Sequence, residues 1–245
     1  MISPALRSDL APTGTLRVGI NYGNPVLATR VPASGELRGV AVDLARELGT
    51  RTGLPIDLVS YDSAGKMVEA LQAGGWDIAF LAIDPGRAGQ ISFTAPYLEI
   101  EGTYLVLAGS RLRAIEDIDR EGVRVGLSSG SAYDLFLSRS LQHAELVHAP
   151  NPNGAFDLIV SGKVDAVAGV RQHLIANSAK LPGSRVLDGR FMAIQQALGI
   201  PKSHDASLKY LREFIEDAKA SGLVAQAIEK AGISGVSIAP KASIR

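Results

Sequence analysis

The sequence contains no cysteine, and only 5% of its 245 residues are aromatic. Without cysteine the chain can form no disulfide, no thiolate nucleophile and no cysteine-ligated metal site. Its four histidines show no ligand spacing, and no glycine-rich phosphate-binding motif occurs. The sequence therefore predicts neither a bound metal nor a cofactor.

Net charge is also absent, because 25 Lys and Arg residues balance 25 Asp and Glu residues. A neutral chain offers no electrostatic attraction to nucleic acid or to an anionic membrane surface, so neither is an expected partner. The longest apolar runs have the length of a strand and are too short to span a bilayer. Nothing in the sequence calls for an oligomer, and we expect a monomer.

The first nine residues lack the positively charged segment and following apolar segment of a secretory signal. Such a signal is either absent from the gene or already removed. The second reading predicts a periplasmic protein, and a cytoplasmic location is the alternative.

What the sequence does contain is an alternation of short apolar runs with helical patterns, which is typical of α/β proteins. The runs expected as strands lie at 16–20, 56–60, 77–81, 102–108, 123–127, 145–148, 164–168 and 191–200. The patterns expected as helices lie at 40–52, 63–73, 131–140, 153–161 and 203–231.

Two elements recur in the two halves of the chain. The run LRVGI at 16–20 is echoed by VRVGL at 123–127, and a small polar loop containing glycine follows each. The run LQAGGWD at 71–77 is matched by IVSGKVD at 159–165, where a helix ends on glycine and a strand begins on aspartate. We therefore expect two similar lobes.

The first lobe should comprise residues 14–108 and 193–245, and the second residues 109–192, joined by a two-stranded hinge. In open α/β sheets, ligands bind beyond the carboxyl ends of the strands. The loops 21–25 and 128–132 are then expected to face one cleft, with hinge closure around a small ligand.

Arg87 follows the expected strand 77–81 closely, in the sequence DPGR at 84–87. A guanidinium in that position can bind a carboxylate through two parallel hydrogen bonds. The alternative is a solvated loop arginine paired with Asp84.

Four segments of the first half resemble the family 3 extracellular solute-binding proteins, the polar amino-acid receptors of ABC importers. LRGVAVDLA at 37–45 is similar to the family's L-x-G-F-x-V-D-L-A, and LQAGGWD at 71–77 to its L-x-x-G-x-x-D. DPGR at 84–87 and ISFTAPY at 91–97 resemble its T-P-E-R and F-S-x-P-Y stretch.

In the second half, GSA at 130–132 stands where the family has G-T-T, and GKVDA at 162–166 matches the family's G-K-V-D-A. Each motif is weak alone, but their order and spacing from Leu16 to about Ala231 are specific. The resemblance implies a periplasmic-binding-protein-like fold of type II. It also implies a receptor that closes around a small carboxylate-bearing ligand, an amino acid or related organic acid, with a membrane permease as partner.

The resemblance also implies roles for single residues. Arg87 would bind the ligand's α-carboxylate, and Ser131, at the start of a helix, would complete the anion site with its backbone N–H. Tyr22 lies where the family places an aromatic against the ligand side chain, and an exposed loop tyrosine is the alternative. The other residues expected at the ligand from these two loops are Asn21, Gly130 and Ala132.

The departures from the family pattern leave the ligand's amine open. Ala82 and Asp84 replace hydroxyl residues that help to hold the carboxylate, and Asp84 could neutralise Arg87. Val170 stands where the family has the acid that pairs with the ammonium, and a buried unpaired ammonium is costly. Either another acid (Asp84, Glu99 or Glu101) takes the ammonium, or the ligand has no amine and Arg171 adds a second cation.

Two enzyme alternatives remain at this point. Glu99 and Glu101, two solvated acids on the simplest interpretation, could include a general acid, as in the cyclohexadienyl dehydratases that this fold also resembles. The run GLSSG at 126–130 fits a nucleophile elbow, with Asp165 or Asp188 and then His204 in hydrolase order.

Overall fold

The chain forms two compact units in a computed structural model that describes residues 2–242. Unit 1 takes the described residues of 1–62, 66–99 and 195–245, and unit 2 takes 63–65 and 100–194. Residues 243–245, which the sequence analysis assigned to the first lobe, lie outside the described residues.

Apart from the short segment 63–65, the chain changes unit within two strands, β7 (Leu98–Val106) and β12 (Met192–Pro201). The first crossing lies upstream of the boundary expected after Ala108. The reason is that residues 102–106 of β7 form an antiparallel ladder with Ala166–Val170 of unit 2.

Unit 1 is built on a sheet in the order β4-β1-β5-β12, with β6 beside β12. Strands β4 and β5 both run parallel to β1, whereas β12 is antiparallel to β5. The strands of this unit are β1 (Leu16–Asn21), β2 (Thr29–Arg30), β3 (Leu37–Arg38), β4 (Ile56–Tyr61), β5 (Ile78–Ala82), β6 (Ile91–Phe93) and β13 (Val236–Ile238), together with the ends of β7 and β12.

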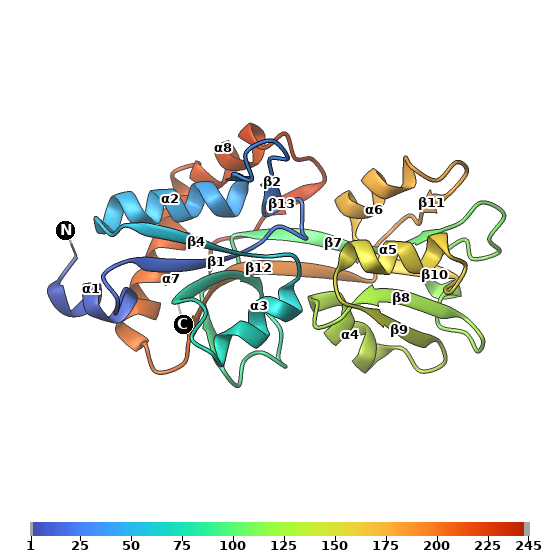
Figure 1. Cartoon of the computed structure of the whole chain (residues 1–245), viewed down its shortest axis with the longest axis horizontal. Helices are drawn as coiled ribbons and strands as arrows, with labels where there is room; N and C mark the ends of the chain where they lie inside the picture. The colour runs from blue at the N-terminus through green and yellow to red at the C-terminus, as the bar shows by residue number, and fades with distance from the viewer. Residues whose placement is uncertain (1, 243–245) are drawn as a thin grey trace. The chain divides into compact units, whose positions relative to one another are not determined.

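Helices cover both faces of this sheet, as Figure 1 shows for α2 and α3 on opposite sides of β1. Helix α2 packs its buried apolar residues on β1 and β4 and ends at Gly53, whose φ of 65° is a left-handed cap. On the other face, Gly19 leaves room for Met67 of α3. The helices are α1 (Pro4–Leu10), α2 (Val40–Thr52), α3 (Ala64–Leu71), α7 (Asp205–Ala220) and α8 (Leu223–Lys230).

Unit 2 repeats this plan on a smaller sheet in the order β7-β10-β8-β9, in which β8, β9 and β10 are parallel. Helix α5 packs on β8, β9 and β10, and Ile159 and Leu174 belong to the core between helices and sheet. The elements are the 3-10 turn Ile115–Asp117, β8 (Arg124–Ser128), α4 (Ala132–Ser140), β9 (Glu145–Ala149), α5 (Pro152–Val160), β10 (Ala166–Val170), α6 (Arg171–Ser178) and β11 (Arg185–Val186).

The expected α/β class is confirmed, and most elements lie within a few residues of their expected bounds. Two differences matter. Helix α6 begins directly at Arg171, where no helix was expected. The helical stretch expected at 203–231 is two helices, because Gly222 adopts a φ of 81° between them.

The two units share one interaction at matching positions. In unit 1 the Asp77 carboxylate accepts from the backbone N–H of Arg17 at 2.8 Å and from its Nε at 3.1 Å. In unit 2 the Asp165 carboxylate accepts from the N–H of Arg124 at 2.9 Å and from its Nε at 3.1 Å. Each pair joins the starts of two neighbouring parallel strands, β1 with β5 and β8 with β10. The repeat seen in the sequence is therefore also a repeat of structure.

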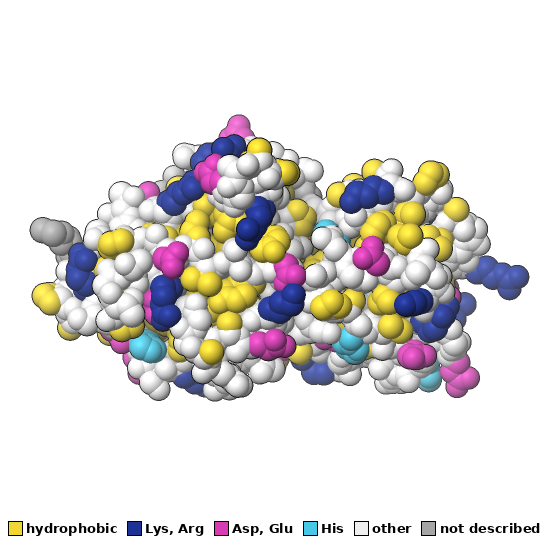
Figure 2. Space-filling view, viewed as in Figure 1, with side chains coloured by type: hydrophobic (Ala, Val, Ile, Leu, Met, Phe, Trp, Pro, Cys, Tyr) yellow, Lys and Arg dark blue, Asp and Glu magenta, His cyan; other side chains and the backbone are white. Residues whose placement is uncertain are grey.

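Charges of both signs are interspersed over the face seen in Figure 2, without a large field of one sign. No helix among residues 2–242 combines the length and the apolar character needed to cross a membrane.

The two Arg–Asp pairs differ in burial, which predicts different costs of removal. The Asp77 side chain is 7% exposed, and that of Asp165 is 39% exposed. We expect Asp77→Ala to lower the free energy of unfolding by about 3 kcal/mol, because it leaves backbone and guanidinium donors without their acceptor. Asp165→Ala should cost about 1 kcal/mol, because water replaces the lost partner.

Urea unfolding of the two variants, followed by circular dichroism, measures both costs. Equal costs, or a larger cost for Asp165→Ala, would contradict this account of the pairs.

Candidate functional site

The carboxyl edge of the unit 1 sheet carries the side chains with the most unusual environment. The register pairs Val18 with Ile78 and Ile20 with Ser60, so β4, β1 and β5 end at a common edge. The loops that leave β1 and β5 at this edge contain Tyr22 and Arg87.

Arg87 is 3% exposed and therefore almost wholly desolvated. Its Nη1 donates to the carbonyl oxygen of Ala82, the last residue of β5, at 2.7 Å. Burial lowers the pKa of the Arg87 guanidinium to about 10, so the group remains cationic at neutral pH. A buried cation of this kind is stabilised by any anion that reaches it.

Asp84 is also buried, and its negative charge raises the pKa of Arg87 in opposition to burial. Its Oδ1 accepts from the N–H of Gly86 at 2.7 Å, and its carbonyl accepts from the N–H of Arg87 at 3.0 Å. Asp84 and Arg87 therefore belong to the same turn. A ligand carboxylate at this turn would be attracted by Arg87 and repelled by Asp84.

The loop after β1 is held by its own side chains. Oδ1 of Asn21 accepts from the N–H of Gly23 at 2.9 Å, and Oδ1 of Asn24 accepts from that of Val26 at 3.1 Å. A Cβ on Gly23 would lie 2.0 Å from the carbonyl oxygen of Asp62, so only glycine fits there. This packing fixes the backbone on both sides of Tyr22.

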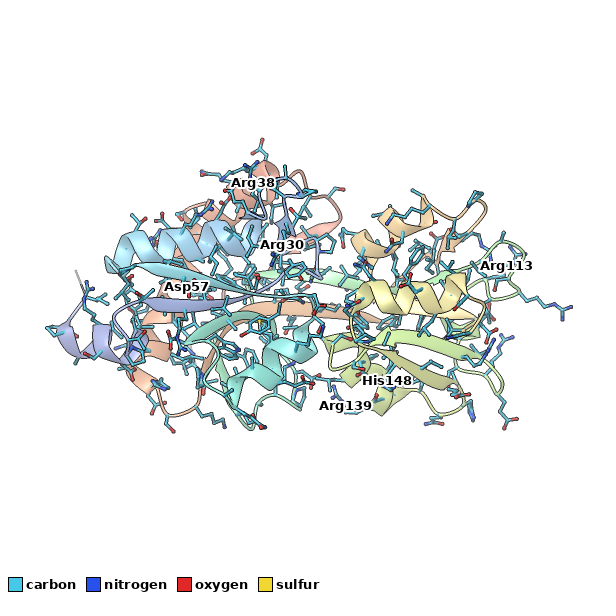
Figure 3. The ribbon with its side chains drawn as sticks, in the orientation of Figure 1. Arg30, Arg38, Asp57, Arg113, Arg139 and His148 are labelled. Atoms are coloured by element: carbon cyan, nitrogen blue, oxygen red, sulfur yellow. The ribbon has the colours of Figure 1, made fainter. Side chains whose placement is uncertain are left out.

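Tyr22 is half-buried, and one face of its ring is covered by Arg30. The guanidinium carbon of Arg30 lies 4.6 Å from the ring centroid, a cation–π distance. Nη2 of Arg30 also donates to the Ser60 hydroxyl at 2.6 Å. In Figure 3, Asp57 marks the start of β4, and Arg30 lies toward the opposite, carboxyl end of that strand.

The loop after β8 in unit 2 contains Gly130, Ser131 and Ala132, the three residues expected at the ligand from this half. Gly130 has a φ of 68°, which favours glycine, and Ser131 is the N-cap of α4, where its Oγ accepts from the N–H of Asp134 at 3.0 Å. Ala132 is buried in the first turn of α4.

Asp134 organises this loop. It is 6% exposed, and its carboxylate accepts from the N–H of Gly130 at 2.8 Å and from the Ser138 hydroxyl at 3.1 Å. The ring of His148, labelled in Figure 3, bonds the same carboxylate through Nε2 at 2.9 Å. A negative charge at the N-terminus of α4 is favourable there, so the first turn of α4 already has an acceptor of its own.

Tyr133 follows Ala132 in the first turn of α4 and is buried. Burial raises the pKa of its hydroxyl to about 12, so this side chain stays protonated at neutral pH.

Arg171 and Glu101 form an ion pair in unit 2. Nε of Arg171 donates to Oε2 of Glu101 at 2.5 Å, and its Nη1 donates to the carbonyl of Leu187 at 3.3 Å. Arg190 lies 3.9 Å from the same carboxylate. Val170, which precedes Arg171 at the end of β10, is buried. The cation proposed for the ligand's second anchor therefore already has a carboxylate partner.

The remaining acids and hydrolase residues are engaged elsewhere. Glu99 accepts from Nε2 of Gln195 at 3.1 Å, and the His204 ring bonds Asp9 at 2.7 Å. Asp165 binds Arg124, as described above, so the structure does not support a catalytic triad from these residues. Among residues 2–242, no group of three or more acidic or histidine side chains is arranged to hold a metal ion.

Sequence reasoning missed Arg30, Asp134 and His148. A sequence pattern could have identified Asp134, because Ser131 and Asp134 have the spacing of a capping box at the start of an expected helix. No sequence pattern identifies Arg30 or His148, since their contacts with Tyr22 and Asp134 form only in the folded chain.

A family model described as bacterial extracellular solute-binding proteins, family 3, matches residues 16–232. Over 215 residues the chain is 23% identical to the ABC transporter arginine-binding protein 1 of Escherichia coli, covering 83% of this chain and 86% of that one. It is also 28% identical over 130 residues to the virulence sensor protein BvgS of Bordetella pertussis, a match over 53% of this chain that spans only 10% of BvgS.

Solved structures share the fold. A mutant of ArgBP from T. maritima superposes with a TM-score of 0.80 at 22% identity, over 93% of this chain and 99% of that one. An ancestral arginine-binding protein bound to glutamine gives a TM-score of 0.77 at 26% identity, over 89% of this chain and 97% of that one. The expected periplasmic-binding-protein-like fold of type II is confirmed by these matches.

The role of Asp134 in the loop is testable by its removal. Asp134→Ala leaves three donors (the N–H of Gly130, the Ser138 hydroxyl and the His148 ring) without their acceptor, and we expect it to cost about 2 kcal/mol of unfolding free energy. Asp188→Ala is the matched control, since Asp188 is an exposed acid of the same unit. Its cost should stay within about 0.5 kcal/mol.

Chemical denaturation of both variants gives the comparison. Similar midpoints and slopes for Asp134→Ala and Asp188→Ala would show that the carboxylate does not hold the loop.

Proposed function

Because the chain belongs to the bacterial extracellular solute-binding proteins of family 3, we propose that it binds a small carboxylate-bearing solute through Arg87. The observation that carries the proposal is the environment of that guanidinium. It is buried at the carboxyl edge of the parallel strands β4, β1 and β5, where ligands of open α/β proteins bind.

The physical basis is the cost of the buried cation. A desolvated guanidinium gains more from an anion than a solvated one does, because water no longer screens the pair. Two parallel hydrogen bonds to a carboxylate would add directional specificity. Asp84 already offers part of this stabilisation, so the ligand must compete with an internal acid.

The remaining sequence-assigned contacts belong to the same proposal. Tyr22 and Asn21 lie in the loop after β1, beside the edge that carries Arg87, and Ala82 offers its carbonyl to that guanidinium. The parts of Gly130, Ser131 and Ala132 in ligand binding, and closure of the protein around the ligand, stay predictions.

The alternative of a lyase is not favoured. The curated relatives that match most of the chain are named as binding proteins, including an arginine-binding, a glutamine-binding and an L-cystine-binding protein. Of the two candidate general acids, Glu101 is ion-paired with Arg171 and Glu99 accepts a hydrogen bond from Gln195.

A membrane permease of an ABC importer is the proposed partner, and the periplasm the proposed location, in keeping with the family's extracellular character. The BvgS match supports a second candidate role as the ligand-sensing part of a sensor. Both roles begin with capture of a solute.

Arg87→Met tests the anchor. Methionine keeps most of the aliphatic part of the side chain and removes the guanidinium with its charge. The free protein then loses the hydrogen bond to the Ala82 carbonyl and the cation beside Asp84, so it should lose some stability. We expect the affinity for the best-binding carboxylate to fall roughly a hundredfold. Isothermal titration calorimetry and ligand-induced thermal shifts measure it, with exposed Arg113 (Figure 3) as the control in Arg113→Met.

An unchanged affinity in Arg87→Met would show that the anchor is elsewhere. For the unaltered protein, ligand at a hundred times its dissociation constant should add about 2.7 kcal/mol of stability. If no small carboxylate produces a shift, the proposed function is wrong.

Asp84→Asn separates the two alternatives for the ligand's amine. If the ligand has no amine, Asp84 only repels the carboxylate, and its neutralisation should tighten binding, by roughly tenfold for one removed like charge. If Asp84 holds an ammonium, the same variant should weaken binding of the amino acid. Titrating Asp84→Asn with an α-amino acid and with the same acid lacking the amine decides between them.

A further inference from the structure

A second cation, Arg30, lies at the same edge of the unit 1 sheet as Arg87 and has no role in the site described so far. The guanidinium of this exposed residue is held in two ways, by stacking on Tyr22 at 4.6 Å and by a 2.6 Å hydrogen bond to the Ser60 hydroxyl. An exposed arginine that is oriented by two neighbours has lost part of the side-chain freedom that such residues normally keep.

The strand register places both cations near the same edge of the sheet. β1 pairs with β5 at a constant offset, Val18 with Ile78 and Gly19 with Ala79, and continuing that offset sets Tyr22 beside Ala82. On the other side of β1, Ser60 pairs with Ile20, two residues before Tyr22. Ser60 and Ala82 are therefore two strand spacings apart and two residues apart along the strands, on the order of 12 Å.

Each cation is tied to one side of this short edge. Arg87 donates to the carbonyl of Ala82 on β5, and Arg30 donates to Ser60 on β4. Each guanidinium lies within hydrogen-bond distance of its anchor atom, so the two cations are separated by a similar distance. After about 3 Å for a hydrogen bond at each end, a ligand of four to six carbon atoms, roughly 5–8 Å long, has a suitable length to meet both.

Within the described part of the chain, Arg30 has no ion pair. Among residues 2–242, no carboxylate lies within ion-pair distance of its guanidinium, whereas the neighbouring Arg38 on β3 is paired with Glu36 at 2.9 Å. Both arginines are exposed and both are held by neighbours, but only Arg38 has an acidic partner.

We propose that Arg30 binds a second anionic group of the ligand, so that the site selects dicarboxylates over monocarboxylates of the same length. Arg87 holds one carboxylate, and Arg30, stacked on Tyr22, holds the other. The inference rests on the proposed function, because it takes Arg87 as the first anchor. It adds the chemical class of the ligand, an acidic solute, with or without an amine.

Matched pairs of probes test the selection. Succinate and butyrate have the same number of carbon atoms and differ in one carboxylate, as do glutarate and pentanoate, and L-glutamate and L-glutamine differ in side-chain charge. In the unaltered protein we expect the member with two carboxylates, in at least one pair, to bind about tenfold more tightly. Isothermal titration calorimetry at low and high salt gives the affinities, and the preference should shrink as salt screens the exposed charge.

The variant Arg30→Gln should lose this preference while keeping the affinity for the monocarboxylate within about twofold, because the Arg87 anchor is intact. Arg38→Gln is the matched control, an exposed arginine of the same unit with an acidic partner of its own, and should bind as the unaltered protein does. Ser60→Ala, which removes the hydroxyl that orients Arg30, should lose part of the preference. Equal melting temperatures would confirm that these surface variants fold.

The outcomes distinguish a failure of the Arg30 role from a failure of the proposed function. If the unaltered protein binds monocarboxylates through Arg87 but shows no preference for dicarboxylates, or if Arg30→Gln weakens both members of a pair equally, the role of Arg30 is wrong and the proposed function stands. If no carboxylate binds at all, the proposed function falls, and the role of Arg30 falls with it.

Discussion

The buried guanidinium of Arg87 is the constraint around which the candidate site is built. A cation that is 3% exposed requires compensation, and the carbonyl of Ala82 and the charge of Asp84 contribute to it. The turn from Ala82 to Arg87 is therefore shaped by electrostatics as well as by packing. A buried cation attracts an anion more strongly than a solvated one does, which is why we propose a carboxylate as the ligand group.

The strands beneath the site owe their positions to the repeated Arg–Asp pairs. Arg17 with Asp77, and Arg124 with Asp165, join the starts of neighbouring strands, and the ligand-side loops leave the opposite ends of those strands. Fixing the strands at one end sets the level at which they finish, so residues distant from the site determine where Tyr22 and Ala82 lie. The loops themselves are held locally, by Asn21 and Gly23 in unit 1 and by Asp134 in unit 2.

Much of the fold was predictable because it follows from local patterns. Helix α2 has the bounds expected from its apolar spacing and from Gly53, and Ser131 caps α4 as its position suggested. The position of Arg87 after β5 was also predictable, since it depends on one strand and one short turn. The interactions that were not predictable join residues far apart in the sequence. Arg171 meets Glu101 across 70 positions, and Arg30 meets Ser60 across 30. Neither contact leaves a periodic signal, because a single side-chain pair does not repeat along the chain.

The departures at Asp84 and Val170 from the pattern of family 3 receptors leave the ligand's amine as the open chemical question. The carboxylate is the feature on which every alternative agrees. The most direct measurement is a crystal structure of the protein grown with the carboxylate that gives the largest thermal shift. The account predicts that one carboxylate of the ligand lies within hydrogen-bond distance of the Arg87 guanidinium, at the carboxyl edge of β5. A bound carboxylate that makes no contact with Arg87 would contradict it.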